Sequence, residues 1–196
     1  MEVDMSKIRI IKATNNPLSA DVIIYEGQTG TWVYDVGRSD ESYKLLQQLP
    51  AKNIVISHFH PDHMANLDRL SYDNLYIGNN TFKYTKHGTV VDEILEVEEN
   101  IRIIPMPSSH AKGSLALQIG RECLLVGDGL YPQHKGYMRV YNVQHLRAQI
   151  ELIEHMDVRW IGLSHRPRFF QEKGLILAYY KDIYNRRNKN EAFVVV

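Results

Sequence analysis

The segment from Ser57 to His63 reads Ser-His-Phe-His-Pro-Asp-His and places three imidazoles and one carboxylate within six residues. His58 and His60 are two positions apart, so on an extended segment their side chains point to the same side and can share one ion. Pro61 is expected to bend the chain into a loop, after which Asp62 and His63 face a second position. Neutral imidazole and carboxylate suit Zn²⁺ best, and iron and manganese also accept them. The segment therefore predicts metal binding.

Three further residues of ligand type lie downstream, each just after a run of apolar residues that reads as a strand. They are His110, Asp128 and His165. Strand ends from different parts of a sheet can converge on one cleft, and rigid edges of this kind suit metal ligands. We therefore expect these three side chains to join the histidine segment.

The elements that must position these residues are strand-rich, with helices in each half of the chain. The first three strands read as an antiparallel meander, and Gly120-Arg121 reads as the turn of a hairpin. The strands are expected at 7–13, 21–26, 31–36, 53–57, 74–77, 101–104, 114–119, 122–126 and 158–163, and the helices at 42–49, 143–155 and 174–187.

Composition limits the protein class. The chain has 196 residues, which suits a single domain over residues 1–196, and its 23 basic residues balance its 23 acidic residues. That balance gives no general attraction to nucleic acid, and no apolar run approaches the ~20 residues that span a bilayer. A single cysteine, Cys123, and an N-terminus without an apolar signal region favour a cytoplasmic location. We expect no membrane partner, and we expect nucleic acid to be an unlikely partner.

The order and spacing of these motifs resemble the metallo-β-lactamase superfamily, in particular its compact single-domain metallo-hydrolase branch. Five motifs carry the resemblance: Asp35 in Tyr34-Asp35-Val36-Gly37, the His-x-His-x-Asp-His segment, His110 with Gly113-Ser114, Asp128 after Gly127, and His165. The resemblance implies an α+β fold, a four-layer αβ/βα sandwich with the site along one edge of two packed sheets.

The resemblance also implies a site for two divalent metal ions, most readily zinc. The first ion would be held by His58, His60 and His110. The second would be held by Asp62, His63 and His165, and Asp128 would bridge the two ions. Asp35 would hold the histidine loop through hydrogen bonds, as outer partners of metal ligands do.

The function expected from this site is hydrolysis of a small ester, thioester or lactone by a metal-activated hydroxide, with Asp62 orienting the nucleophile. Many β-lactamases of the family carry cysteine where this chain has Asp128, which argues against antibiotic hydrolysis. Three alternatives remain open. They are a phosphodiesterase or nuclease acting on a nucleotide or RNA, an iron-dependent oxidoreductase of the sulfur dioxygenase type, and a binding module without turnover.

Contacts to the small-molecule substrate are predicted less specifically. Tyr131 lies three residues past Asp128, so its hydroxyl is a candidate catalytic group that could reach a carbonyl oxygen. Arg166 and Arg168 flank His165 and could bind an anionic group bidentately. Lys112 could face the cleft, and His134 and Tyr137 could form one wall of it.

Overall fold

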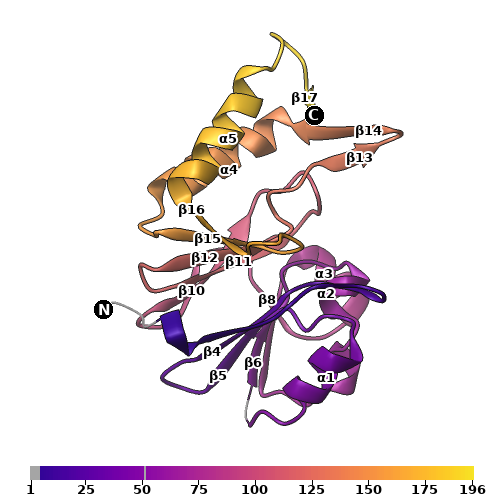
Figure 1. Ribbon diagram of the computed structural model, residues 1–196, viewed down its shortest axis with the longest axis vertical. Helices are drawn as coiled ribbons and strands as arrows, with labels where there is room; N and C mark the ends of the chain where they lie inside the picture. Colours follow the sequence, from indigo (N-terminus) through magenta and orange to yellow (C-terminus); the bar gives the residue numbers. More distant parts are fainter. Residues whose placement is uncertain (1–4, 51) are drawn as a thin grey trace.

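Two six-stranded mixed sheets form the centre of this computed structural model, which describes residues 5–50 and 52–196 (Figure 1). The first sheet has the order β1-β4-β5-β6-β7-β8 and the second the order β16-β15-β12-β11-β10-β9. The first contains β1 (Ile8–Ile11), β4 (Val22–Glu26), β5 (Thr31–Tyr34), β6 (Lys52–Val55), β7 (Asn74–Ile77) and β8 (Thr89–Val90). The second contains β9 (Leu95–Glu98), β10 (Ile101–Met106), β11 (Ser114–Ile119), β12 (Cys123–Gly127), β15 (Trp160–Leu163) and β16 (Phe170–Glu172).

Helices cover the outer face of each sheet, which gives the four layers of an αβ/βα sandwich (Figure 1). The first sheet carries α1 (Asp40–Leu46), α2 (Pro61–Met64) and α3 (Asn79–Thr85), and the second carries α4 (Val143–His155) and α5 (Lys173–Asn185). Two short 3₁₀ helices occupy Met5–Lys7 and Leu67–Arg69. The expected α+β sandwich is therefore confirmed.

Strand periodicity explains how both sheets are buried on two faces. In β5, Trp32 and Tyr34 pack into the core between the sheets, whereas Val33 packs into the core beneath α1. In β12, Leu125 faces the core between the sheets and Leu124 faces the core beneath α4 and α5. Because successive side chains point to opposite faces, an unbroken apolar run is what a strand between two layers requires.

Several predicted elements begin and end where the sequence places them. The strands at 74–77 and 114–119 and the helix at 143–155 match β7, β11 and α4. The meander of β1, β4 and β5 is antiparallel, as expected. Cys123 is fully buried in β12, and burial raises the pKa of its thiol to about 12.

Other predictions need correction. The helix expected at 42–49 begins earlier, at Asp40, because the Ser39 hydroxyl accepts a hydrogen bond from the backbone N–H of Ser42 and caps it. Pro61 starts the short helix α2 instead of bending a loop, since proline lacks the N–H that a first helical position leaves unused. Residues 1–4, part of the segment read as lacking a signal, lie outside the described residues.

A third sheet, not anticipated from the sequence, extends beside α4. Its order is β13 (Gln133–Lys135), β14 (Met138–Asn142) and β17 (Phe193–Val195). The β13–β14 hairpin projects from the body (Figure 1), and Tyr137 stands fully exposed in its turn, so it is not part of a cleft wall. A fourth sheet, of two short strands, pairs β2 (Thr14–Asn15) with β3 (Leu18–Ser19).

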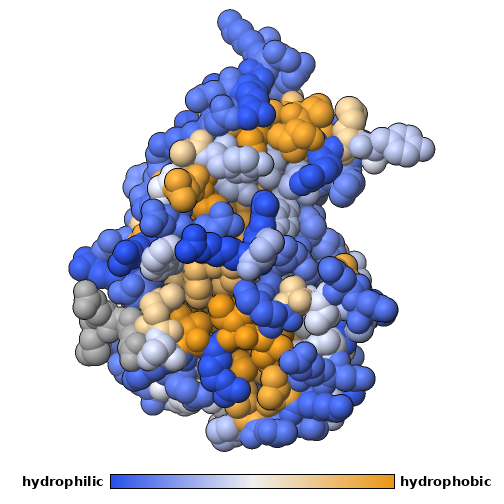
Figure 2. Space-filling view, in the orientation of Figure 1, coloured by the Kyte–Doolittle hydropathy of each residue, from blue (hydrophilic) through white to orange (hydrophobic). Residues whose placement is uncertain are grey.

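Polar and charged residues cover most of the face in view, and hydrophobic residues show through in patches over the sheets (Figure 2). Among the described residues, no helix combines the length and apolar character needed to span a membrane.

Candidate metal centre

The predicted ligands lie on loops and a short helix that follow strand ends of both sheets. His58 and His60 follow β6, and His63 lies on α2. His110, Asp128 and His165 lie just beyond β10, β12 and β15. The structure therefore brings all seven side chains together in two groups at this edge.

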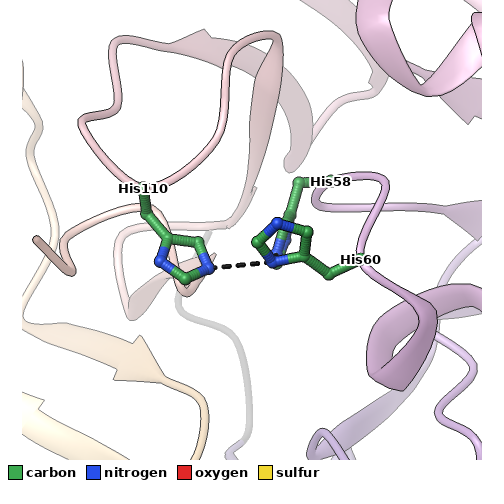
Figure 3. Close-up of side chains that lie close together, drawn as sticks. All are labelled: His58, His60 and His110. Atoms are coloured by element: carbon green, nitrogen blue, oxygen red, sulfur yellow. Dashed lines mark hydrogen bonds between the residues drawn. The ribbon is translucent and has the colours of Figure 1, made fainter. Parts of the chain in front are cut away.

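The first group, which we call the trihistidine cluster, contains His58, His60 and His110 (Figure 3). The Nδ1 atom of His60 lies 2.9 Å from His58 Nε2 and 3.0 Å from His110 Nε2. The rings converge from two separate loops (Figure 3). Three imidazole nitrogens at this spacing form a ligand set that suits zinc and other divalent transition metals.

The second group, the mixed cluster, contains Asp62, His63, Asp128 and His165. The Oδ2 atom of Asp62 lies 3.0 Å from His165 Nε2 and 3.5 Å from His63 Nε2. His63 is completely buried, and its Nε2 atom also lies 3.4 Å from Asp128 Oδ2. Two imidazoles and two carboxylates thus surround one centre.

Asp128 lies between the two clusters. Its Oδ2 atom is 3.6 Å from His110 Nε2 in the trihistidine cluster and 3.8 Å from His165 Nε2 in the mixed cluster. The side chain is almost fully buried. A single carboxylate oxygen therefore faces the ligand atoms of both groups.

The backbone before Asp128 requires glycine. Gly127 has a φ of +53°, and a Cβ at this position would lie 2.8 Å from the Ser57 hydroxyl oxygen. A larger residue would be strained by its backbone and would collide with the loop that carries His58. Gly127 therefore lets the two ligand loops approach.

Asp35 orients the histidine loop from behind. Its Oδ1 atom accepts a hydrogen bond from the backbone N–H of Ser57 at 2.7 Å, and its Oδ2 atom accepts one from the Ser57 hydroxyl at 2.8 Å. The same Oδ2 atom lies 2.7 Å from His63 Nδ1. This contact directs Nε2 of His63 into the mixed cluster, which is the usual role of a carboxylate behind a metal-ligating histidine.

Asp21 makes a similar contact that sequence reasoning missed. This buried carboxylate accepts a hydrogen bond from the backbone N–H of His165 at 2.9 Å, and the Asp21 N–H donates to the Ser164 hydroxyl at 2.9 Å. The neighbouring Ala20 N–H donates to the Asp62 carbonyl at 2.9 Å. An acidic residue directly before the apolar run of β4 was the available signal, because a buried acid needs a partner.

The two clusters differ in electrostatics. Burial and the neighbouring imidazoles hold the pKa of His58 well below its ordinary value. Burial would also lower the pKa of His63, but Asp35 and Asp128 outweigh it and raise the value to about 10. Burial would raise the pKa of Asp128, yet its histidine neighbours lower it. The imidazole pKa values are thus lowered throughout the trihistidine cluster, whereas the carboxylates of the mixed cluster raise the pKa of both His63 and His165.

Two buried polar atoms test whether these residues fit metal ions. Nε2 of His63 and Oδ1 of Asp128 have no hydrogen-bond partner among the described residues, although both are shielded from solvent. Buried polar atoms without partners are rare, and one recognised reason is an ion. Both atoms belong to the mixed cluster. Its imidazole and carboxylate donors match the ligands that divalent metals take, so these residues fit a metal ion.

The predicted substrate-contact residues are dispersed. Tyr131 lies beside the trihistidine cluster, with its ring centroid 6.3 Å from that of His110, and its hydroxyl donates to the Ser164 carbonyl at 2.5 Å. The guanidinium of Arg166 lies over the Tyr131 ring. Lys112, Arg166 and Arg168 are exposed, and both arginines border one hollow with Trp160.

Comparison with known proteins identifies solved structures of similar fold. No model of a protein family matches the chain, and no curated protein matches it either. Many solved structures are similar. The peroxy diiron species of the chemotaxis sensor ODP has a TM-score of 0.68 at 11% identity, with 94% of this chain and 94% of that chain covered.

Two further structures agree. ETHE1 from Myxococcus xanthus gives a TM-score of 0.65 at 12% identity, covering 94% of this chain and 92% of that one. An archaeal metallo-β-lactamase superfamily protein from Sulfolobus tokodaii gives a TM-score of 0.60 at 18% identity, covering 94% of this chain and 88% of that chain. At these identities the likeness establishes the fold alone. The resemblance seen in the sequence is therefore confirmed for the fold, which is the metallo-β-lactamase fold.

Proposed function

We propose that this protein is a dinuclear metal-dependent hydrolase acting on a small ester, thioester or lactone. The observation that supports this most is the position of Asp128, whose Oδ2 atom faces ligand nitrogens of both clusters at 3.4–3.8 Å. A carboxylate shared between two ligand sets is what a two-metal site requires. When bound, two divalent cations polarise a carbonyl oxygen and lower the pKa of water, which supplies a nucleophile near neutral pH.

Side chains of the protein orient the attacking water and hold the metal ligands in place. Asp62 turns its Oδ2 atom toward His63 and His165, and its other carboxylate oxygen orients the attacking water and accepts its proton. Asp35 and Asp21 fix His63 and His165 from behind. Pre-organisation of this kind keeps the reacting atoms in place without reorganisation during the reaction.

Tyr131 is the second proposed catalytic group. The Tyr131 hydroxyl donates a hydrogen bond to the Ser164 carbonyl. It must therefore rotate away from that contact before it can donate to a substrate carbonyl. The phenol is protonated at neutral pH, and burial raises its pKa further, to about 12. A protonated phenol beside the trihistidine cluster is suited to stabilise a developing oxyanion.

An iron-dependent oxidoreductase is the second candidate. The chemotaxis sensor with the similar fold is a diiron protein, and imidazole with carboxylate suits iron as well as zinc. A phosphodiesterase is the third candidate, because the same metal ligands can support phosphodiester cleavage. The metal in the purified protein therefore separates the candidates, and the cytoplasmic location stays a prediction.

The test combines elemental analysis with a substrate panel. Protein loaded separately with zinc, manganese and iron is assayed on an ester, a thioester, a lactone and a phosphodiester, and oxygen consumption is followed in parallel. Hydrolysis of a carbonyl substrate by the zinc or manganese form is expected. Turnover of the phosphodiester alone, or oxygen consumption by the iron form without hydrolysis, would overturn the proposal.

A further inference from the structure

The loop beyond His165 places a cationic group at the rim of the metal centre. The guanidinium carbon of Arg166 lies 5.2 Å from the centroid of the Tyr131 ring, and that ring lies 6.3 Å from the ring of His110. Stacking on an aromatic face limits the conformations of an arginine side chain. Arg166 is therefore held one aromatic ring away from the trihistidine cluster.

Arg166 has no carboxylate partner among the residues that the structure describes. Five other arginines do form ion pairs; they are Arg69, Arg102, Arg121, Arg147 and Arg186. The planar guanidinium presents a fork of N–H donors that matches an oxyanion bidentately. A guanidinium without a carboxylate partner, placed beside a reaction centre, is available to an anionic ligand.

A pocket of about 210 Å³ opens beside this arginine, between the end of β15 and α5. Leu163 and Tyr180 are buried residues of its lining, and Gln171 and Tyr179 add an amide and a second phenol. No acidic residue contributes to this lining. The pocket itself therefore offers hydrogen-bond donors and one positive charge, while Glu172 lines an adjoining hollow that Arg166 and Gln171 also border.

We propose that this pocket, the Arg166 pocket, binds an oxyanion carried by the substrate, a carboxylate or a phosphate group remote from the bond that is cleaved. The inference rests on the proposed hydrolase function, because it assigns the substrate of that same site. Arg166 and His110 each lie beside the Tyr131 ring, so we expect the anionic group to sit several bonds from the reacting carbonyl. Arg168 is absent from the lining of this pocket and borders the adjoining hollow together with Arg166.

Matched esters test the assignment. The p-nitrophenyl monoesters of succinate, adipate and suberate are compared with the butyrate, hexanoate and octanoate esters, which have acyl chains of equal length without the terminal carboxylate. The wild-type protein should prefer the charged member of at least one longer pair. Arg166→Gln should raise KM for that charged ester about tenfold more than KM for the matched neutral ester, because both esters share any effect of the substitution on Tyr131.

Two variants control for charge and for folding. Arg166→Lys keeps the charge but loses the fork, so its KM should lie between those of wild type and Arg166→Gln. Arg159→Gln makes the same substitution at an exposed arginine over Trp160, at the start of β15, and should change nothing. Equal effects of Arg166→Gln on charged and neutral esters would overturn the proposal.

A binding measurement separates this inference from the hydrolase function. Calorimetry on the purified protein with its metal ions compares adipate with hexanoate, and butyl phosphate with butanol. Tighter binding of adipate that is lost in Arg166→Gln supports a carboxylate-bearing substrate even if no ester is hydrolysed, in which case only the hydrolase proposal fails. The same pattern for butyl phosphate supports a phosphorylated substrate. If the affinity for neither anion changed in Arg166→Gln, oxyanion binding by the Arg166 pocket would be refuted.

Discussion

The carboxylate of Asp21 accepts a hydrogen bond of 2.9 Å from the backbone N–H of His165, although the two residues are 144 positions apart. His165 has a φ of +59°, a left-handed conformation that is uncommon for a residue other than glycine. Such a backbone persists only where surrounding contacts hold it. Asp21, at the start of β4, therefore ties the first half of the chain to a metal-ligand loop of the second half.

Removing this contact should weaken the mixed cluster. Asp21→Ala leaves the His165 N–H without its acceptor, so we expect metal affinity at the second position to fall by about 10–100-fold. Asp21→Asn keeps an amide oxygen as acceptor and should restore much of the affinity. Elemental analysis after dialysis against a graded competitor chelator measures the effect.

Lys12→Ala serves as the control for Asp21. Lys12 lies 3.7 Å from Asp21 Oδ1 but is exposed and does not contact His165, so its removal should leave metal content unchanged. Two ions bound with wild-type affinity in Asp21→Ala would show that His165 needs no support from Asp21.

Tyr131→Phe removes one hydroxyl beside the trihistidine cluster. We expect turnover of carbonyl substrates to fall, because the variant loses the phenol that is proposed to stabilise the oxyanion. The free energy of unfolding should fall by about 1 kcal/mol from the lost hydrogen bond to Ser164. Steady-state kinetics and denaturant titration measure the two effects separately. An unchanged kcat would eliminate the hydroxyl as a catalytic group.

Glu98 predicts a pH dependence of stability away from the metal centre. Burial would raise its pKa, but hydrogen bonds from the Thr29 hydroxyl, from Trp32 Nε1 and from backbone N–H groups outweigh burial and hold it below the ordinary value of 4.5. A carboxylate with a lowered pKa stabilises the fold above its unfolded-state pKa, and this contribution disappears as the pH falls through the folded-state pKa.

Glu98→Gln should therefore reduce the free energy of unfolding at neutral pH by about 1 kcal/mol, a small effect because solvent screens this partly exposed carboxylate, and the difference from wild type should shrink as the pH falls through the folded-state pKa. Urea titrations across this pH range give the comparison. Glu96→Gln is the control in the same strand, since Glu96 is exposed and pairs only with exposed Arg102. A difference that does not depend on pH would contradict the role of the Glu98 charge.

Chelation tests the need for metal in any activity found. Incubation with a strong chelator should abolish turnover, and adding back the divalent ion should restore it, because both clusters consist only of metal-ligand side chains. Far-ultraviolet circular dichroism recorded in parallel shows whether the fold persists. A chelated protein that is metal-free and still active would exclude metal catalysis.

Much of the site could be predicted from the sequence because its ligands lie in short motifs with distinctive residue types. His58, His60 and His63 are close in sequence, and the strands before His110 and His165 have clear apolar patterns. Asp21 escaped prediction because its partner is distant in the chain, and a single aspartate before a strand has no distinctive spacing. The hairpin of β13 and β14 escaped because its short strands, Gln133–Lys135 and Met138–Asn142, are largely polar or exposed.

The architecture required more than strand patterns. Apolar runs at β5 and β12 indicated buried strands, but they do not specify which sheet each joins or that β5 and β6 pair in parallel. Those pairings depend on contacts between segments far apart in the chain. The resemblance to a known family supplied the four-layer arrangement, and the two sheets with their outer helices match it.

The most direct test of a shared two-metal centre counts the ions in wild type and in Asp128→Ala, prepared side by side. Elemental analysis after exhaustive dialysis should give two ions per chain for the wild type and fewer for Asp128→Ala, with turnover lost in the same preparation. Asp157→Ala, which removes an exposed aspartate paired with Arg121, should keep both ions. Full metal content with full turnover in Asp128→Ala, or a wild-type protein that binds no divalent ion, would contradict the account.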